Sequence, residues 1–187
     1  MKKQIISFLF LISLFTALNL NGQQPVKSAI DVIMSSYSVR MYAPGPVSDS
    51  DIDLILKSGI KAPSARNLQP WWFTVVKDQA LLKELMPNIT DGNILIVISG
   101  REDAQTVEFD CGLAVQNMFI TAQSLGLGAR IYGGPVNSIN TSKREILGIP
   151  QGYRAIVVLR IGHPDKSVDA VSAASARKSI QEVVNFK

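Results

Sequence analysis

The sequence predicts an α+β fold with a mixed central sheet of four to five strands, flanked by helices. Four short apolar segments are rich in Val and Ile, as strands are, and one much longer segment is apolar on almost every helical turn. The strands are expected at residues 71–76, 94–99, 129–132 and 154–162, and the long helix at 106–125. A chain of 187 residues is long enough to bury the core of one such domain.

The first 22 residues are expected to form a signal peptide, which leaves residues 23–187 as a single mature domain. Lys2 and Lys3 precede an uncharged apolar run at 5–18, and this run is shorter than the about twenty residues that cross a bilayer as a helix. Cleavage is expected near Gly22. The pattern predicts a secreted or periplasmic protein, and the alternative is a membrane anchor formed by an uncleaved signal.

Two helices are expected before the first strand. The helix at 26–37 is expected to bury one apolar stripe, which consists of Val26, Ile30, Ile33 and Met34. The second helix begins after Ser48, whose hydroxyl is a favourable N-cap, and ends before Pro63. Its buried face comprises Ile52, Ile55, Leu56 and Ile60.

The later elements follow from apolar runs and glycines. The uninterrupted apolar run at 94–99 predicts a strand buried on both faces. The helix at 106–125 is expected to be central because it is apolar on almost every turn. A short helix is expected at 143–147. The tail is polar until apolar residues return at 180–186, which indicates that it reaches over a partner subunit.

The composition excludes several kinds of chemistry. One Cys and one His exclude a disulfide framework and a Cys- or His-based metal site, so no metal ligands are expected. The basic residues are not interleaved with aromatic ones, which argues against nucleic-acid binding. Cys111 lies within the packed helix and His163 beyond the last strand, and both are interpreted as structural.

Two segments before the first strand carry candidate binding groups. Ser38 and Arg40 are two residues apart on extended chain, so a hydroxyl and a guanidinium point the same way and suit an anion such as phosphate. The alternative is a solvated arginine at a helix end. The loop at 62–71 places amides and hydroxyls between two prolines, where they suit the edge of a planar ring system. The alternative is a connecting loop with Trp71 and Trp72 in the core.

A third segment runs from Asp110 to Gly134. Small residues, namely Gly112, Ala114 and Ala122, are expected to let another helix pack closely against this one. The glycines that follow, Gly126, Gly128, Gly133 and Gly134, free the backbone to approach a ligand. A G-x-G-x-x-G run is missing, so a Rossmann dinucleotide site is not supported.

Together the three segments resemble the nitroreductase family of flavin oxidoreductases over nearly the whole mature chain. The loop APSARNLQPW at 62–71 is the most specific element, and the D-x-G-x-A-x-x-N helix that begins at Asp110 and ends in Gly-Leu-Gly is next. The set is completed by Ser38-x-Arg40-x-Tyr42 and by the pair Arg177 and Lys178.

The resemblance implies an α+β homodimer that holds FMN at the subunit interface and exchanges its C-terminal segments between protomers. Ser38 and Arg40 would face the FMN phosphate, with Arg177 or Lys178 meeting it from the tail. The residues that would line the isoalloxazine from the other subunit are Pro63, Ser64, Ala65 and Asn67. Gly133 and Gly134 would lie against the ring.

The implied activity is reduction of nitroaromatic or quinone-type acceptors in a ping-pong cycle with NAD(P)H or another donor. The flavin would carry the chemistry, so no catalytic side chain is expected. The sequence departs from the family at Ser36, where a basic residue is usual, and FMN is expected to be held more weakly for that reason. The alternative function is a non-catalytic flavin-binding protein that stores or scavenges FMN.

Overall fold

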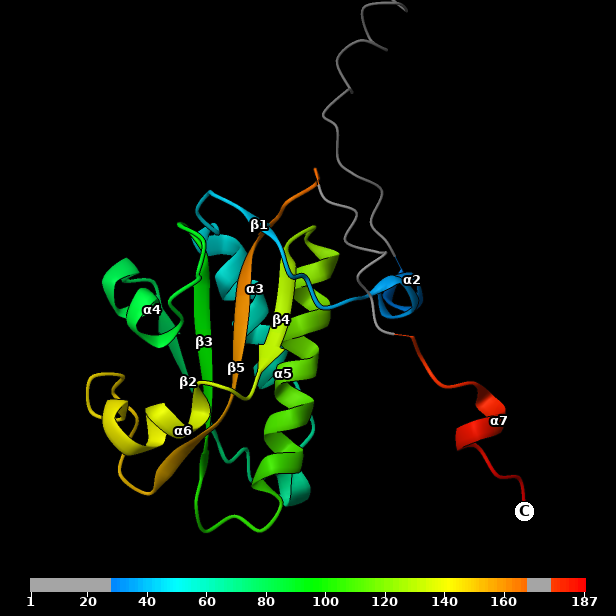
Figure 1. Cartoon of the computed structure of the whole chain (residues 1–187). Coiled ribbons are helices and arrows are strands. Elements are labelled where there is room, and N and C mark those ends of the chain that lie inside the picture. The colour runs from blue at the N-terminus through cyan, green and yellow to red at the C-terminus, as the bar shows by residue number, and fades with distance from the viewer. Residues whose placement is uncertain (1–27, 168–175) are drawn as a thin grey trace, which may run out of the picture.

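The structure is a computed structural model that describes residues 28–167 and 176–187. The expected signal peptide and Val26 lie outside these residues. The described strands form one sheet, with helices packed on both of its faces (Figure 1). No helix in the described part of the chain is long and apolar enough to cross a membrane.

The sheet contains the four predicted strands and one short additional strand. Its order is β2 (Trp71–Val76), β3 (Ile94–Arg101) and β5 (Tyr153–Pro164), and β5 also pairs with β4 (Gly128–Tyr132) and β1 (Tyr42–Ala43). All the ladders between these strands are antiparallel, so the sheet is not mixed as predicted. The end of β2 pairs with the start of β3, so the chain between these two strands turns back at one end of the sheet. Strand β4 pairs with the second half of β5.

One face of the sheet carries the two longest helices, α3 (Asp49–Ile60) and α5 (Val107–Ser124), as predicted. Ile96 of β3 points to this face, and α5 is therefore central. The two helices can approach closely because residue 59 of α3 is a glycine. A Cβ at Gly59 would lie 2.1 Å from the Met118 side chain of α5. Gly112 was expected to provide this closeness, but it is exposed and a Cβ there would meet nothing within 4 Å.

The opposite face is covered by two short helical segments (Figure 1). These are α4 (Gln79–Leu85), which the sequence pattern did not predict, and the segment that joins α6 (Val136–Ser138) to a π-helical turn (Ile139–Lys143). The predicted helix at 143–147 is thus displaced toward the N-terminus. Asn140 explains the position, because its side chain accepts from and donates to the backbone of Ala155 on β5, at 2.8 and 2.9 Å.

The first described helix, α2 (Ala29–Ser35), does not bury the stripe that was predicted. Its buried residue is Val32, whereas Ile30, Ile33 and Met34 are exposed. No described segment of the chain covers that apolar face of α2, since the helix contacts α5 through its other side. The last helix, α7 (Ile180–Val183), lies apart from the sheet in Figure 1 and also exposes its apolar residues.

Candidate functional site

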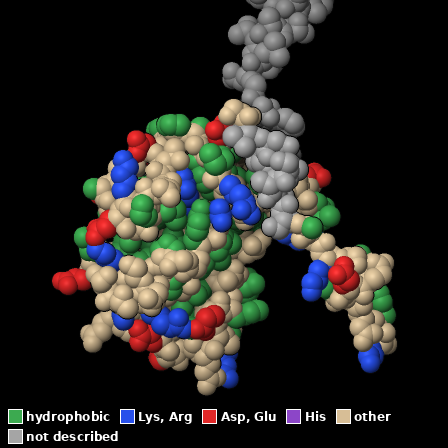
Figure 2. Space-filling view, viewed as in Figure 1, with side chains coloured by type: hydrophobic (Ala, Val, Ile, Leu, Met, Phe, Trp, Pro, Cys, Tyr) green, Lys and Arg blue, Asp and Glu red, His purple; other side chains and the backbone are tan. Residues whose placement is uncertain are grey.

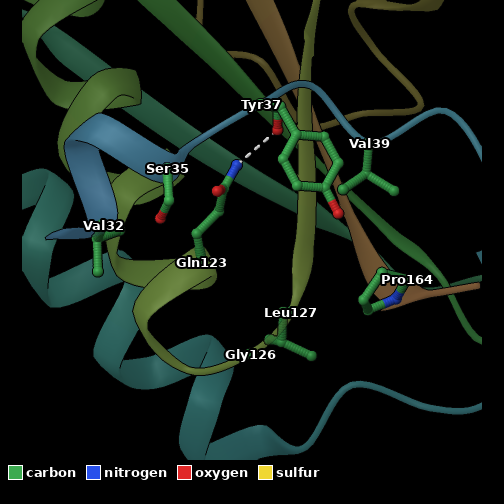
Figure 3. A pocket seen from close by; sticks show the side chains of 8 residues that line it. All are labelled: Val32, Ser35, Tyr37, Val39, Gln123, Gly126, Leu127 and Pro164. Carbon is green, nitrogen blue, oxygen red and sulfur yellow. Dashed lines mark hydrogen bonds between the residues drawn. The ribbon is translucent and has the colours of Figure 1, made fainter. Parts of the chain in front are cut away.

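The segment that carries Ser38 and Arg40 is fixed to the sheet and to α5 (Figure 3). Gln123 of α5 donates to the Tyr37 carbonyl at 2.7 Å, and the Val39 N–H donates to the Ala129 carbonyl of β4 at 3.1 Å. Val39 is buried, and the side chains of Ser38 and Arg40 on either side of it are exposed. Ser38 and Arg40 are therefore both accessible to a ligand, while Val39 between them fixes the segment to the domain.

Arg40 opens onto a cavity of about 440 Å³ on the α4 face of the sheet. The residues that line this cavity are Arg40, Met41, Tyr42, Met86, Asn88, Thr90, Tyr132 and Arg160. We call it the Arg40 cavity. None of the eight lining residues is acidic, and Arg40 has no ion-pair partner among the described residues.

A second arginine of this cavity was not identified from the sequence. Arg160 lies on β5 and is only 5% exposed, and its guanidinium is 4.0 Å from the centre of the Tyr42 ring. It donates to Asn93 Oδ1 at 2.7 Å and to Thr90 Oγ1 at 3.0 Å, both of which are neutral groups. The sequence could have indicated this residue, because Arg160 follows the apolar run at 155–159 within a predicted strand. A charge buried in such a strand requires polar partners.

The loop between α3 and β2 has an unusual backbone. Arg66, Asn67 and Gln69 have φ angles of 53°, 56° and 47°, in the left-handed region that residues other than glycine rarely adopt. The Gln69 N–H donates to Ser64 Oγ at 2.9 Å, which closes the loop on itself. Strained backbone of this kind concentrates at functional sites.

Two polar residues of α5 fasten this loop to the domain. Asp110 is completely buried and accepts from the Ala65 N–H at 3.0 Å and from the Thr106 hydroxyl at 2.9 Å. Seven residues later, Asn117 donates to the Ser58 carbonyl in the last turns of α3, at 3.1 Å. The D-x-G-x-A-x-x-N pattern therefore has a physical role, because its two polar residues hold the chain on both sides of the loop.

The neighbouring tryptophans are not both in the core. Trp72 is 46% exposed, and Trp71 is half-buried and stacked on Phe73 at 6.2 Å between ring centres. Pro63 and Asn67 are exposed, and Ser64 and Ala65 are half-buried. The side of the loop that follows α3 is therefore open to a ligand or to a partner chain.

The remaining predicted residues lie at two further places. Gly133 and Gly134 are exposed directly after Tyr132, which lines the Arg40 cavity, and a Cβ at either glycine would meet nothing within 4 Å. Neither glycine has a positive φ, so the fold itself does not require glycine at these positions. Arg177 and Lys178 are exposed ahead of α7.

The structure brings only part of the predicted site together within one chain. Arg40 and Tyr132, the neighbour of Gly133, line the Arg40 cavity, whereas Ala65 and Arg66 line a separate cavity of about 310 Å³ with residues at the start of α5. Within one chain, the loop and Arg40 therefore do not share a cavity. The resemblance implied a site to which two chains contribute.

Burial shifts the pKa of two other titratable side chains near the site, and a third side chain is hydrogen-bonded. Burial raises the pKa of Tyr42 far above its ordinary value, and this effect outweighs the nearby Arg160, so the phenol keeps its proton. Burial also raises the pKa of Cys111 to about 12, because the thiolate would be desolvated inside α5. His163 is hydrogen-bonded to the Pro46 carbonyl at 3.0 Å.

A five-stranded antiparallel sheet with a central helix, a cavity lined by two arginines and a strained polar loop define an α+β domain whose basic groups suit an anionic ligand. Comparison with known proteins identifies the domain more closely. The chain belongs to the nitroreductase family, whose family model matches residues 33–94 and 83–163.

Individual relatives agree with this membership. A protein of Archaeoglobus fulgidus, named for NADH dehydrogenase and NAD(P)H nitroreductase activity, is 32% identical over 160 residues, which are 79% of this chain and 92% of the relative. A solved structure from Bacteroides thetaiotaomicron, also named for those two activities, is 26% identical with a TM-score of 0.71, and the match covers 86% of this chain and 97% of that one. A nitroreductase solved in complex with FMN from Desulfovibrio desulfuricans is 26% identical with a TM-score of 0.73, over 86% and 97% of the two chains.

Proposed function

We propose that this protein is an FMN-dependent oxidoreductase that takes electrons from NAD(P)H or another donor and transfers them to nitroaromatic or quinone-type acceptors. The observation that carries the proposal is that Ser38 and Arg40 are exposed, and that Arg40 lines a cavity without acidic residues, in a chain of the nitroreductase family. The relative of known structure that binds FMN and the relative named for NAD(P)H both support it.

The residues present fit FMN. Ser38 and Arg40 offer an exposed hydroxyl and an exposed guanidinium that has no ion-pair partner among the described residues, which suits the phosphate. At Gly133 and Gly134 the space that a Cβ would occupy is open, although the fold does not require glycine, so a flat ring can lie against the backbone. Arg177 and Lys178 are the basic residues of the tail that we propose for the same phosphate.

Bound FMN would supply the reversible transfer of two electrons, and the side chains would supply position and hydrogen bonds. Ser64 Oγ accepts from the Gln69 N–H, so its own proton remains available to a ligand. Asn67 Oδ1 accepts from the side-chain Nε2 of Gln69 at 3.1 Å, so the Asn67 NH₂ group is available to donate to a ligand. Pro63 and Ala65 fix the loop that presents these two donors.

We further propose that the functional unit is a homodimer, with the loop of one chain completing the site of the other. The separation of the loop and Arg40 into two cavities supports this proposal, as does the uncovered apolar face of α2. The tail with α7 is proposed to cross to the partner, since it exposes Ile180 and Val183.

The location of the protein bears on its electron donor. We propose export through the N-terminal signal pattern, and outside the cytoplasm a quinol or a redox protein would replace NAD(P)H. Mass spectrometry of the N-terminus, on protein from fractionated cells, tests this: a chain beginning near Gln23 in the exported fraction is expected. A full-length chain in the cytosol would contradict export.

A second candidate is a carrier that binds FMN without turnover. One observation favours weak phosphate binding: the Ser36 hydroxyl donates to the Ile33 carbonyl at 2.9 Å, at the end of α2, and the position has no basic group. The deciding experiment is an absorbance spectrum of the purified protein with FMN, before and after anaerobic NADPH. We expect flavin bands that bleach with NADPH and return with a quinone; flavin that neither NADPH nor a quinol reduces would favour the carrier, and no bound flavin would refute both functions.

A further inference from the structure

The Arg40 cavity contains more positive charge and more hydrogen-bond donors than its protein neighbours use. Arg160 is buried, yet its partners among the described residues are neutral: the side chains of Asn93 and Thr90, the ring of Tyr42 and, at 3.9 Å, the sulfur of Met86. A buried charge is stable when it is paired, and no acidic residue lines this cavity. Within the part of the chain that the structure describes, the site therefore has an uncompensated cation.

A second cation lies directly opposite. Arg130 of β4 and Arg160 of β5 are register partners in the antiparallel ladder, so both side chains are on the same face of the sheet. Arg130 stacks on the Tyr132 ring, with its guanidinium 4.7 Å from the ring centre. Like charges placed opposite each other on a sheet are destabilising, and an anion between them would relieve the repulsion.

Neutral donors surround these charges. The Tyr42 side chain lines the cavity and is over nine-tenths buried, and its hydroxyl has no hydrogen-bond partner among the described residues. Thr90 Oγ1 accepts from Arg160, so its proton is available, and Asn88 contributes an exposed amide. Among the residues that line the cavity, Arg40 and Arg160 thus provide two guanidinium groups, and Tyr42, Thr90 and Asn88 provide neutral donors, without a competing carboxylate.

We infer that the Arg40 cavity is a phosphate-binding site in which Arg160 and the Tyr42 hydroxyl act together with Arg40. A phosphate monoester matches the site better than a carboxylate does, because it carries up to two charges and three acceptor oxygens for the donors present. The inference deepens the proposed function, since Arg40 belongs to both sites. Arg160 would supply the charge that Ser36 does not.

The phosphate could be carried by FMN or by a nicotinamide nucleotide, and variants of the full chain distinguish these sources. Arg160→Met keeps much of the side-chain volume without the charge, and Tyr42→Phe removes only a hydroxyl that has no partner. Arg154→Met on the same strand, where the arginine pairs with Glu108 at the surface, and Tyr153→Phe are matched controls. The measured quantities are dissociation constants for FMN and riboflavin, KM for NADPH and NADH, and the thermal shift caused by inorganic phosphate.

If the phosphate is that of FMN, both site variants will bind FMN about 10- to 100-fold more weakly but riboflavin unchanged, while the controls behave as wild type. If it is that of the nicotinamide nucleotide, flavin binding will be unchanged and KM for NADPH will rise more than KM for NADH. In either case the stabilisation by inorganic phosphate will be reduced, and this readout remains informative if the chain binds no flavin. Tyr42→Phe is expected to fold in any case, because it removes an unsatisfied buried group.

The inference is overturned if the folded site variants retain wild-type values for the FMN-to-riboflavin ratio, the two KM values and the phosphate-induced shift. It is also overturned if inorganic phosphate does not stabilise the wild-type protein and FMN binds no better than riboflavin. A wild-type protein that binds no flavin but is stabilised by phosphate through Arg160 would refute the proposed function and support this inference.

Discussion

The roles of single arginines at the phosphate can be separated by substitution. Arg40→Ala removes a guanidinium that has no protein partner among the described residues, so the fold should lose little, while FMN binding should weaken by about 10- to 150-fold, or about 1.5–3 kcal/mol. Arg177→Ala is expected to have an effect of the same order. The measurement is quenching of flavin fluorescence at fixed ionic strength. Unchanged FMN affinity in both variants would refute the phosphate roles of these residues.

Cys111 illustrates a residue whose chemistry is suppressed by its position. Its pKa is raised to about 12 by burial, and its Sγ lies 3.8 Å from the Ser99 carbonyl. The folded protein therefore keeps the thiol proton at pH values where the unfolded chain releases it, near its ordinary value of about 8.5. Since the unfolded state then binds fewer protons, the contribution of this group to stability falls as pH rises above that value.

Two measurements test this prediction for Cys111. Iodoacetamide at pH 8 should leave the folded protein unmodified and should react at once in denaturant. The urea midpoint should fall more between pH 8 and pH 10 in the wild type than in Cys111→Ala. Rapid alkylation of the folded protein would show that the thiol is accessible and ionised, contrary to its position inside α5.

At the scale of elements, α5 organises the candidate site by fixing the loop that precedes β2. Asp110→Ala would leave the Ala65 N–H and the Thr106 hydroxyl without their acceptor, and we expect a loss of about 2–3 kcal/mol in the free energy of unfolding. Asp110→Asn retains an acceptor and should lose less. Asp103→Ala, at an exposed ion pair with Arg101, is the control and should change stability by less than about 1 kcal/mol.

Urea unfolding gives these free energies, and limited proteolysis reports on the loop itself. Faster cleavage near Arg66 in Asp110→Ala, with the rest of the domain intact, is the expected pattern. Equal stability of Asp110→Ala and wild type would show that the hydrogen bonds to Asp110 do not hold the loop.

The elements that the sequence predicted well are those whose apolar pattern is long. The run at 94–99 is buried throughout, and the helix at 106–125 has a broad buried face, so the composition of both reflects their burial. Helix α4 was missed because Leu82 is the only buried residue of its seven. The left-handed residues Arg66 and Asn67 were also beyond prediction, since contacts with Asp110 and Ser64 impose a conformation that neither residue prefers alone.

For the candidate site, the sequence indicated the binding residues themselves better than it indicated the residues to which they are hydrogen-bonded. Ser38 and Arg40 follow from local spacing, because alternation along an extended chain is a local property. Arg160 and the acceptor role of Asp110 depend on pairs that are far apart in the chain, such as Arg160 with Asn93. The predicted stripe on α2 was wrong for a similar reason: the side of the helix that becomes buried is chosen by α5, which packs on Val32.

At the scale of the whole molecule, the apolar residues that the described chain leaves uncovered predict a dimer. Ile33 and Met34 of α2 are 55% and 81% exposed, and α7 also exposes apolar side chains. Basic side chains are visible in front of the sheet on the side of β1 and β4, near the segment that joins α2 to β1 (Figure 2). A second chain placed over α2 would bury this apolar face and would bring another loop to the basic side chains.

Light scattering after size-exclusion chromatography should therefore give twice the monomer mass for the wild type. The double variant Ile33→Asp and Met34→Asp places two charges on the uncovered face and should yield monomers that bind FMN at least tenfold more weakly, because each site would lose the loop of its partner. Ile146→Asp is the matched control, since Ile146 is 62% exposed and lies outside both cavities. A wild type that is monomeric and binds FMN fully would contradict the shared site, and so would a monomeric variant with undiminished affinity.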